Sequence, residues 1–266
     1  NFVEAILNLA TVLDDMNNFD VAIDTFKNVF NIDKGIYKLK AGIKLAILNF
    51  LKEDFVESRK YLSATSNIQE TMYSNLKNEK VYHDYLLLLL NWHEVRYSDG
   101  FNRKVNETLF IIGDSHSLTS HNLYLQQSEG DLFCESKLIY GCKQWHLGNS
   151  SINHFKIKFE SIFYSLPKSS KVLLTFGEID CRLDSGIIKY VVKYPENSIK
   201  KIINTTVENY INYIAKLNLI MNHEITIQGV PCPNIDTKAS SRKDINLLVE
   251  VIKLFKDIKS QWGEID

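Results

Sequence analysis

Two apolar runs that end in the same way constrain the fold of this chain more than any other feature. Residues 108–112 are followed by Gly113-Asp114-Ser115, and residues 171–176 are followed by Gly177-Glu178-Ile179-Asp180. Short apolar runs that stop at a glycine are typical of buried strands, and helical spacing of apolar residues follows each of them. Strands that alternate with helices predict a parallel sheet, in which the carboxyl ends of the strands meet at one edge. We therefore expect the polar residues after the two runs to lie at a common edge.

The remainder of the second half continues this alternation. Strands are expected at 109–112, 137–140, 172–176 and 224–229, and helices near 117–127, 152–166, 199–221 and 241–258. The segment Val230-Pro231-Cys232-Pro233 ends the fourth strand in an extended turn, because proline restricts the residue before it. The expected fold class is α/β, a three-layer α/β/α sandwich with a parallel sheet over residues 108–266.

The first 97 residues have a different sequence pattern, since they contain no proline and their apolar residues recur at helical spacing. Their pattern resembles tetratricopeptide repeats, although a generic helical hairpin shares much of it. The first repeat uses Leu9, Ala10, Leu13, Ala22, Phe26 and Val29, and a shift of 36 residues reaches Leu45, Ala46, Ser58 and Leu62. We predict an all-α helical-repeat region over 1–97, with a third helical pair at 67–77 and 79–96, and a linker over 98–107.

Composition narrows the function classes. The net charge of −1 gives no support for nucleic-acid binding, and the strongest apolar run, residues 85–90, is far too short to span a membrane. No glycine-rich phosphate loop follows any strand, which argues against a nucleotide-binding domain. The four cysteines, Cys134, Cys142, Cys181 and Cys232, lack metal-type spacing, so free thiols in a reducing compartment, and hence a cytoplasmic location, are expected.

The two glycine-terminated motifs, in this order, resemble the SGNH (GDSL-type) hydrolase superfamily of esterases and lipases. Gly113-Asp114-Ser115 is similar to its first block, which implies that Ser115 is the nucleophile and that Asp114 braces the turn. Gly141 is similar to the glycine of the second block, whose N–H helps to hold the oxyanion, and residues 177–180 stand at the third block, with Gly177 and Asp180 supporting the site. The resemblance implies a flavodoxin-like sandwich, no metal and no organic cofactor.

The chain departs from that family pattern at two places. The usual asparagine of the third block is Ile179, so its amide donor is missing or replaced. The family's final Asp-x-x-His block also has no counterpart, since the last histidine is His223. We expect either a domain truncated before that block, which then lies beyond Asp266, or a degenerate domain that binds without hydrolysis.

Several polar residues near these motifs are candidates for substrate contact. His116 follows the nucleophile directly, and His146 lies in a Trp-His-Leu segment after the second expected strand. Glu178 and Arg182 either contact an anionic group of the substrate or form a salt bridge that fixes the loop. Asp114 or Ser115 also has a purely structural interpretation as a helix N-cap.

The resemblance implies a serine esterase or O-acyltransferase that acts on ester-linked acyl groups, with acetyl groups of carbohydrate as the expected substrate. In that case Ser115 attacks the acyl carbonyl, and the N–H groups of Ser115 and Gly141 hold the oxyanion. The alternative is a non-catalytic scaffold in which the helical repeats bind a protein or peptide.

Overall fold

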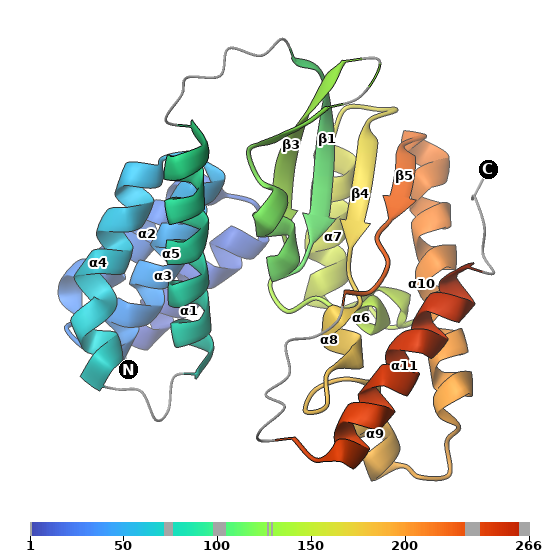
Figure 1. Cartoon of the computed structure of the whole chain (residues 1–266). Coiled ribbons are helices and arrows are strands. Elements are labelled where there is room, and N and C mark those ends of the chain that lie inside the picture. The colour runs from blue at the N-terminus through green and yellow to red at the C-terminus, as the bar shows by residue number, and fades with distance from the viewer. Residues whose placement is uncertain are drawn as a thin grey trace. The chain divides into compact units, whose positions relative to one another are not determined.

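The computed structural model describes residues 2–71, 77–97, 105–126, 128, 130–231 and 240–260 (Figure 1). The chain divides into two compact units, Asn1–Lys104 and Val105–Asp266. Helices make up the first unit, and a sheet with helices makes up the second, so the expectation of helices followed by a mixed α/β region is confirmed. None of the helices in the described ranges has both the length and the apolar character that a membrane crossing requires.

The first unit is built from helices that pack on their neighbours in sequence. Ser58 is fully buried, and its Oγ donates a hydrogen bond of 2.8 Å to the carbonyl oxygen of Ala46 on the preceding helix. Ala10, Ala22 and Phe26 are also fully buried, whereas Leu9 is exposed. The described helices of this unit are α1 (Phe2–Asp15), α2 (Phe19–Ile32), α3 (Ile36–Leu51), α4 (Phe55–Thr71) and α5 (Lys77–Tyr97).

The predicted third helical pair is wrong in its first member. Residues 67–71 of the expected helix are instead the end of α4, which continues without interruption from Phe55 to Thr71. Residues 72–76 lie outside the described residues, and Lys77 begins α5. The sequence of α4 has a helical pattern on both sides of residue 67, so nothing breaks the helix there. Residues 98–104 of the predicted linker lie outside the described residues, and strand β1 begins at Val105.

A five-stranded sheet organises the second unit, in the order β2-β3-β1-β4-β5. β1 pairs in parallel with β3 and with β4, and β4 pairs in parallel with β5. The predicted parallel sheet is therefore confirmed for these four strands, whereas β2 is antiparallel to β3. The strands are β1 (Val105–Gly113), β2 (Leu123–Leu125), β3 (Asp131–Leu138), β4 (Lys171–Thr175) and β5 (Glu224–Ile227).

The helix predicted near 117–127 does not form. A short 3₁₀ helix, η1 (Ser115–Ser120), takes its place and is followed by strand β2. The hydroxyls of Ser117 and Thr119 bond to the carbonyl oxygens of Asp114 and His116, and such local bonds compete with a longer helix. Asn122, with φ of 56°, then turns the chain into β2.

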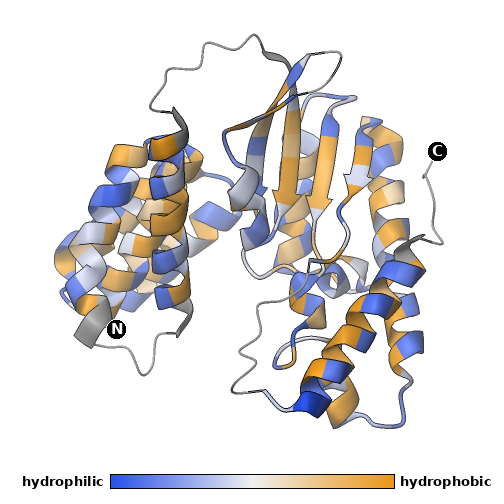
Figure 2. Cartoon of the chain, viewed as in Figure 1, coloured by the Kyte–Doolittle hydropathy of each residue, from blue (hydrophilic) through white to orange (hydrophobic). Residues whose placement is uncertain are grey.

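Helices α7 and α10 lie behind the strands in the view of Figure 1 and share a core with them. Phe159 and Phe163 of α7 and Val207 and Ile214 of α10 are buried in one cluster with Ile112 of β1. Figure 2 shows that β1 and β4 are rich in hydrophobic residues, as expected for strands at the centre of a sheet. The remaining helices are α6 (Gln144–Gly148), α7 (His154–Ser165), α8 (Glu178–Cys181), α9 (Ile187–Lys193), α10 (Ile199–Met221) and α11 (Arg242–Ser260).

The cysteines agree with the expectation of free thiols as far as they are described. Cys134 and Cys142 are buried free thiols, and Cys181 is also buried. Burial raises the pKa of the Cys134 thiol to about 11 and that of Cys142 well above its usual value. These thiols therefore remain protonated and unreactive near neutral pH. Cys232 lies outside the described residues.

Candidate active site at the ends of strands β1 and β4

The candidate site lies where the strand order changes direction. From β1, the chain passes first to β3 on one side and then to β4 on the other side. Ligands of open α/β sheets bind outside the carboxyl ends of strands at such a switch point. Gly113 and Thr175 end β1 and β4 and are paired in register, so the segments that follow them start side by side.

Gly113 permits this close approach of the two strand ends. A Cβ atom at position 113 would lie 1.7 Å from Thr175 Oγ1 and 2.9 Å from the Thr175 carbonyl oxygen. No side chain fits such a space, so the glycine is required by packing and not by chemistry. Gly113 thereby fixes the position of Asp114 and Ser115, which follow it directly.

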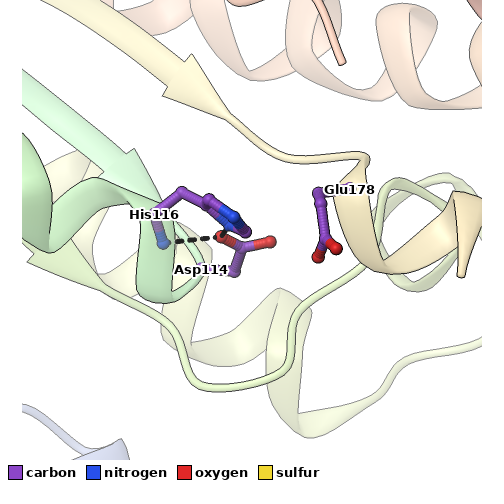
Figure 3. A group of neighbouring side chains, drawn as sticks. All are labelled: Asp114, His116 and Glu178. Carbon is purple, nitrogen blue, oxygen red and sulfur yellow. Dashed lines mark hydrogen bonds and ion pairs between the residues drawn. The ribbon is translucent and has the colours of Figure 1, made fainter. Parts of the chain in front are cut away.

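Asp114 and His116 form a tight pair directly after β1 (Figure 3). Asp114 is fully buried and caps η1, because its Oδ1 accepts a hydrogen bond of 2.9 Å from the His116 backbone N–H. The same Oδ1 lies 2.8 Å from His116 Nδ1. This hydrogen bond raises the pKa of His116, and the negative charge of Asp114 acts in the same direction. The pair therefore favours a proton on His116 Nδ1 that points at the carboxylate.

Glu178 and Arg182 form the second charged pair of the site. Glu178 is buried at the start of α8, and both of its carboxylate oxygens accept from Arg182 Nε, at 3.0 and 2.9 Å. Arg182 Nη2 lies 2.7 Å from Glu178 Oε2. The salt bridge fixes the loop, and it leaves the guanidinium of Arg182 half-exposed. Arg182 can therefore hold Glu178 and still contact an anionic group of a substrate.

Asp180, in the segment 177–180 after β4, binds the start of helix α6, which follows Gly141. Its Oδ2 accepts a hydrogen bond of 2.9 Å from the Gln144 backbone N–H, and its Oδ1 accepts one of 3.1 Å from Trp145 N–H. Because these N–H groups belong to the first turn of α6, the buried carboxylate satisfies donors that a short helix leaves free. Gln144 in turn donates from Nε2 to the Phe176 carbonyl oxygen, at 2.7 Å.

Gly141 and Gly177, the glycines that follow β3 and β4, have backbone conformations that favour glycine. Gly141 has φ of 63°, and nothing lies within 4 Å of the position of a Cβ atom there. Gly177 has φ of 123°, and its Cβ would lie 2.8 Å from Gln144 Nε2. Gly177 is therefore required by both conformation and packing, and Gly141 by conformation alone.

His146 is placed apart from the charged pairs and has a structural role in α6. Its Nδ1 accepts a hydrogen bond of 3.0 Å from the Lys143 backbone N–H, and its ring stacks on Phe155 with centroids 4.0 Å apart. Partial burial lowers the pKa of His146 to about 4, and the charges of Lys143 and His154 add to this effect. His146 is therefore neutral at physiological pH.

This low pKa predicts a specific loss of stability in acid. The folded-state pKa lies below the unfolded value of 6.5, so His146 contributes fully above pH 6.5 and its contribution falls as pH drops toward 4. Between pH 7.5 and pH 4.5, we expect the free energy of unfolding of wild type to fall by about 1 kcal/mol more than that of His146→Gln. The difference is no larger because the ring is only half-buried. Urea denaturation of both proteins at the two pH values measures this difference. Equal losses in the two proteins would contradict the assignment.

Ser115 is half-buried at the first position of η1, next to the Asp114 cap. His223 cannot act on it as a base. His223 precedes β5, at the amino end of a parallel strand, and its Nδ1 accepts from the Ser170 backbone N–H at 3.1 Å. The structure therefore brings Asp114, His116 and Glu178 together, with Arg182 bound to Glu178. Asp180 lies on α8 and accepts from the first turn of the neighbouring helix α6, which contains His146.

A groove of about 680 Å³ was not predicted from the sequence. It is lined by four lysines, three aromatic residues and three asparagines, and the one acidic residue that lines it, Asp180, is bound to the backbone of α6. One sequence signal could have indicated it. Lys189, Tyr190 and Lys193 of α9, with Tyr194 directly after the helix, have a spacing that places them on one side of a helix. The lysines are Lys143, Lys189, Lys193 and Lys201, the aromatic residues Trp145, Tyr190 and Tyr194, and the asparagines Asn149, Asn197 and Asn209.

Comparison with known proteins identifies no relative. No family model matches the chain, and no curated protein and no solved structure is significantly similar to it.

Proposed function

We propose that the second unit is an SGNH-type serine esterase or O-acyltransferase with Ser115 as its nucleophile. The observation that carries this proposal is the position of Ser115, half-exposed at a helix start, directly after β1 at the switch point of a parallel sheet. The strand order β3-β1-β4-β5 agrees with the flavodoxin-like order, and the three-layer sandwich is part of the same proposal.

The proposed chemistry is acyl transfer in two steps. Ser115 Oγ attacks the acyl carbonyl carbon as its proton passes to a base, and the tetrahedral intermediate then breaks its bond to the alcohol oxygen, which takes that proton and leaves the acyl-enzyme. In the second step the hydroxyl group of the acceptor attacks the acyl-enzyme, loses its proton to the same base, and releases Ser115, which regains a proton from it. The backbone N–H groups of Ser115 and Gly141 hold the oxyanion, and the open space beside Gly141 supports this role. Water as acceptor gives an esterase, and a sugar hydroxyl gives an O-acyltransferase. In the family that the motifs resemble, the base is the histidine of an Asp-x-x-His pair.

The groove beside α6 supports a carbohydrate ester as the substrate. Trp145, Tyr190 and Tyr194 offer aromatic faces on which a sugar ring can stack, and the asparagine amides both donate and accept hydrogen bonds. Trp145 follows directly on Gln144, which Asp180 holds against the third motif, so the groove adjoins the candidate site. The lysines favour a sugar that carries negative charge.

The second candidate function is a non-catalytic binding module. It is favoured by Ile179 at the place of an amide donor and by His223, the last histidine, at the wrong end of the sheet. In this case the tetratricopeptide-like repeats of the first unit bind a peptide or protein, and the second unit binds a glycan.

Hydrolysis of a chromogenic acetyl ester and of an acetylated oligosaccharide tests the catalytic proposal. We expect Ser115→Ala to lower kcat/KM of the protein by roughly a thousandfold or more, because the nucleophile is lost. Ser120→Ala, at the other end of η1, is the matched control and retains activity. A fluorophosphonate probe provides a second measurement, since it labels an activated serine whatever the natural substrate.

Two results would count against Ser115. Turnover that survives Ser115→Ala would exclude it as the nucleophile. Absence of both turnover and fluorophosphonate labelling in the wild-type protein would favour the binding module.

A further inference from the structure

We propose that Asp114, His116 and Glu178 bind one divalent transition-metal ion, of the class represented by Zn²⁺. Each residue offers one ligand atom, and these three atoms all lie within 4.8 Å of one another (Figure 3). Carboxylate oxygens and an imidazole nitrogen are donors that such ions accept, and three protein ligands leave a tetrahedral ion one open position. This site goes beyond the proposed ester chemistry, which requires no metal.

An unsatisfied oxygen of Asp114 provides independent support for a cation. The Asp114 side chain is 1% exposed, and its Oδ2 has no hydrogen-bond partner in the described part of the chain. Figure 3 shows this carboxylate between His116 and Glu178, with its second oxygen directed toward Glu178. A buried carboxylate oxygen without a partner is costly, and a cation between Asp114 and Glu178 would satisfy it.

The contacts of Glu178 with Arg182 are compatible with a ligand role. A carboxylate oxygen has two acceptor sites, and Glu178 Oε1 accepts only from Arg182 Nε, so this oxygen still has an electron pair for a metal, whereas Oε2 contacts both Nε and Nη2. Arg182, which binds the Glu178 carboxylate and is not itself a ligand, fixes the orientation of that ligand. The carboxylates of Asp114 and Glu178 and the one guanidinium of Arg182 together have a net negative charge, which attracts a cation.

The site is also accessible from solvent. Asp114 and Glu178 are buried, but the His116 side chain is 38% exposed at the edge of the cluster. An ion can therefore enter past His116 and reach the two carboxylates without unfolding of η1 or α8. An ion bound here would lie beside Ser115, which is between two of its ligands in sequence.

Titration calorimetry with ZnCl₂ tests this site on the full chain after treatment with a chelator. The measurement is made at pH 8, because a metal displaces protons from its ligands and its binding therefore weakens in acid. We expect one ion per chain, and we expect His116→Gln and Glu178→Gln each to weaken binding at least tenfold. Asp184→Asn and His154→Gln remove an exposed carboxylate and an exposed imidazole outside the cluster, and they should bind as wild type does.

Two results would overturn the proposal. One is the absence of Zn²⁺ binding in wild type, and the other is equal binding by wild type, His116→Gln and Glu178→Gln, which would indicate a surface site. Circular dichroism shows whether each variant is folded, and the half-exposed position of His116 makes His116→Gln the safer of the two. Because calorimetry detects binding and not turnover, the outcome does not depend on whether Ser115 is a nucleophile.

Discussion

Gly113→Ala is expected to destabilise the second unit by about 3 kcal/mol, because overpacking at a site without space is among the costly single changes. The added methyl group would lie 1.7 Å from Thr175 Oγ1, so β1 and β4 would have to separate at their carboxyl ends. The same shift would displace Asp114 and Ser115. Urea denaturation, followed by circular dichroism, measures the change in the free energy of unfolding.

Thr175→Ala provides a rescue for this variant. Thr175 Oγ1 is buried without a hydrogen-bond partner in the described structure, so its removal alone should cost little. In the double variant the nearest clash disappears, but the Thr175 carbonyl oxygen is still 2.9 Å away, and we expect roughly half of the loss to be recovered. Gly229→Ala is the matched control, since nothing lies within 4 Å of a Cβ there. Equal stability of Gly113→Ala and Gly229→Ala would refute the packing argument.

Asp180→Ala is expected to lower the free energy of unfolding by about 3 kcal/mol. It leaves the backbone N–H groups of Gln144 and Trp145 without their acceptor, and each orphaned buried donor costs about 1–3 kcal/mol. Helix α6 should then lose its first turn, and with it the wall of the groove that Trp145 provides. Chemical denaturation gives the stability, and the fluorescence of Trp145 reports the local change.

Asp184→Ala is the matched control for the stability loss expected of Asp180→Ala, because Asp184 is exposed and lies only four residues from Asp180. A loss of similar size in both variants would mean that Asp180 does not act through α6. If Asp180→Ala unfolds the chain outright, Asp180→Asn keeps one acceptor oxygen for the two donors, and an intermediate stability is then expected.

The central strands β1 and β4 and the longer helices could be predicted from the sequence because their signals are local. The strand expected at 137–140 was misplaced, since β3 spans Asp131–Leu138, and β2 had no prediction. The helix predicted at 199–221 corresponds to α10, and the runs at 109–112 and 172–176 fall in or next to β1 and β4. Parallel pairing also followed from the alternation of strands and helices. The meeting of Asp114 with Glu178 was predicted at the level of the sheet edge, since both residues follow parallel strands.

The contacts that give the site its character depend on long-range geometry instead. Nothing near Asp180 in the sequence indicates that its carboxylate binds the backbone of α6, which begins 36 residues earlier. The replacement of the predicted helix by η1 and β2 was missed because hydroxyl groups that bond to their own backbone give no periodic signal. The cluster of Asp114, His116 and Glu178 was missed as a metal site for a similar reason, since its ligands come from two separate strand ends.

The central position of β1 has a consequence for the folding of the newly made chain. β1 is the first strand of its sheet to be synthesised, yet its partners β3 and β4 are complete only at residues 138 and 175. Until then both edges of a strand that contains Leu109, Phe110, Ile111 and Ile112 have unpaired backbone groups, a state that favours aggregation. Slow translation through residues 113–175 should therefore reduce the yield of folded protein, and a chaperone that covers apolar segments should restore it.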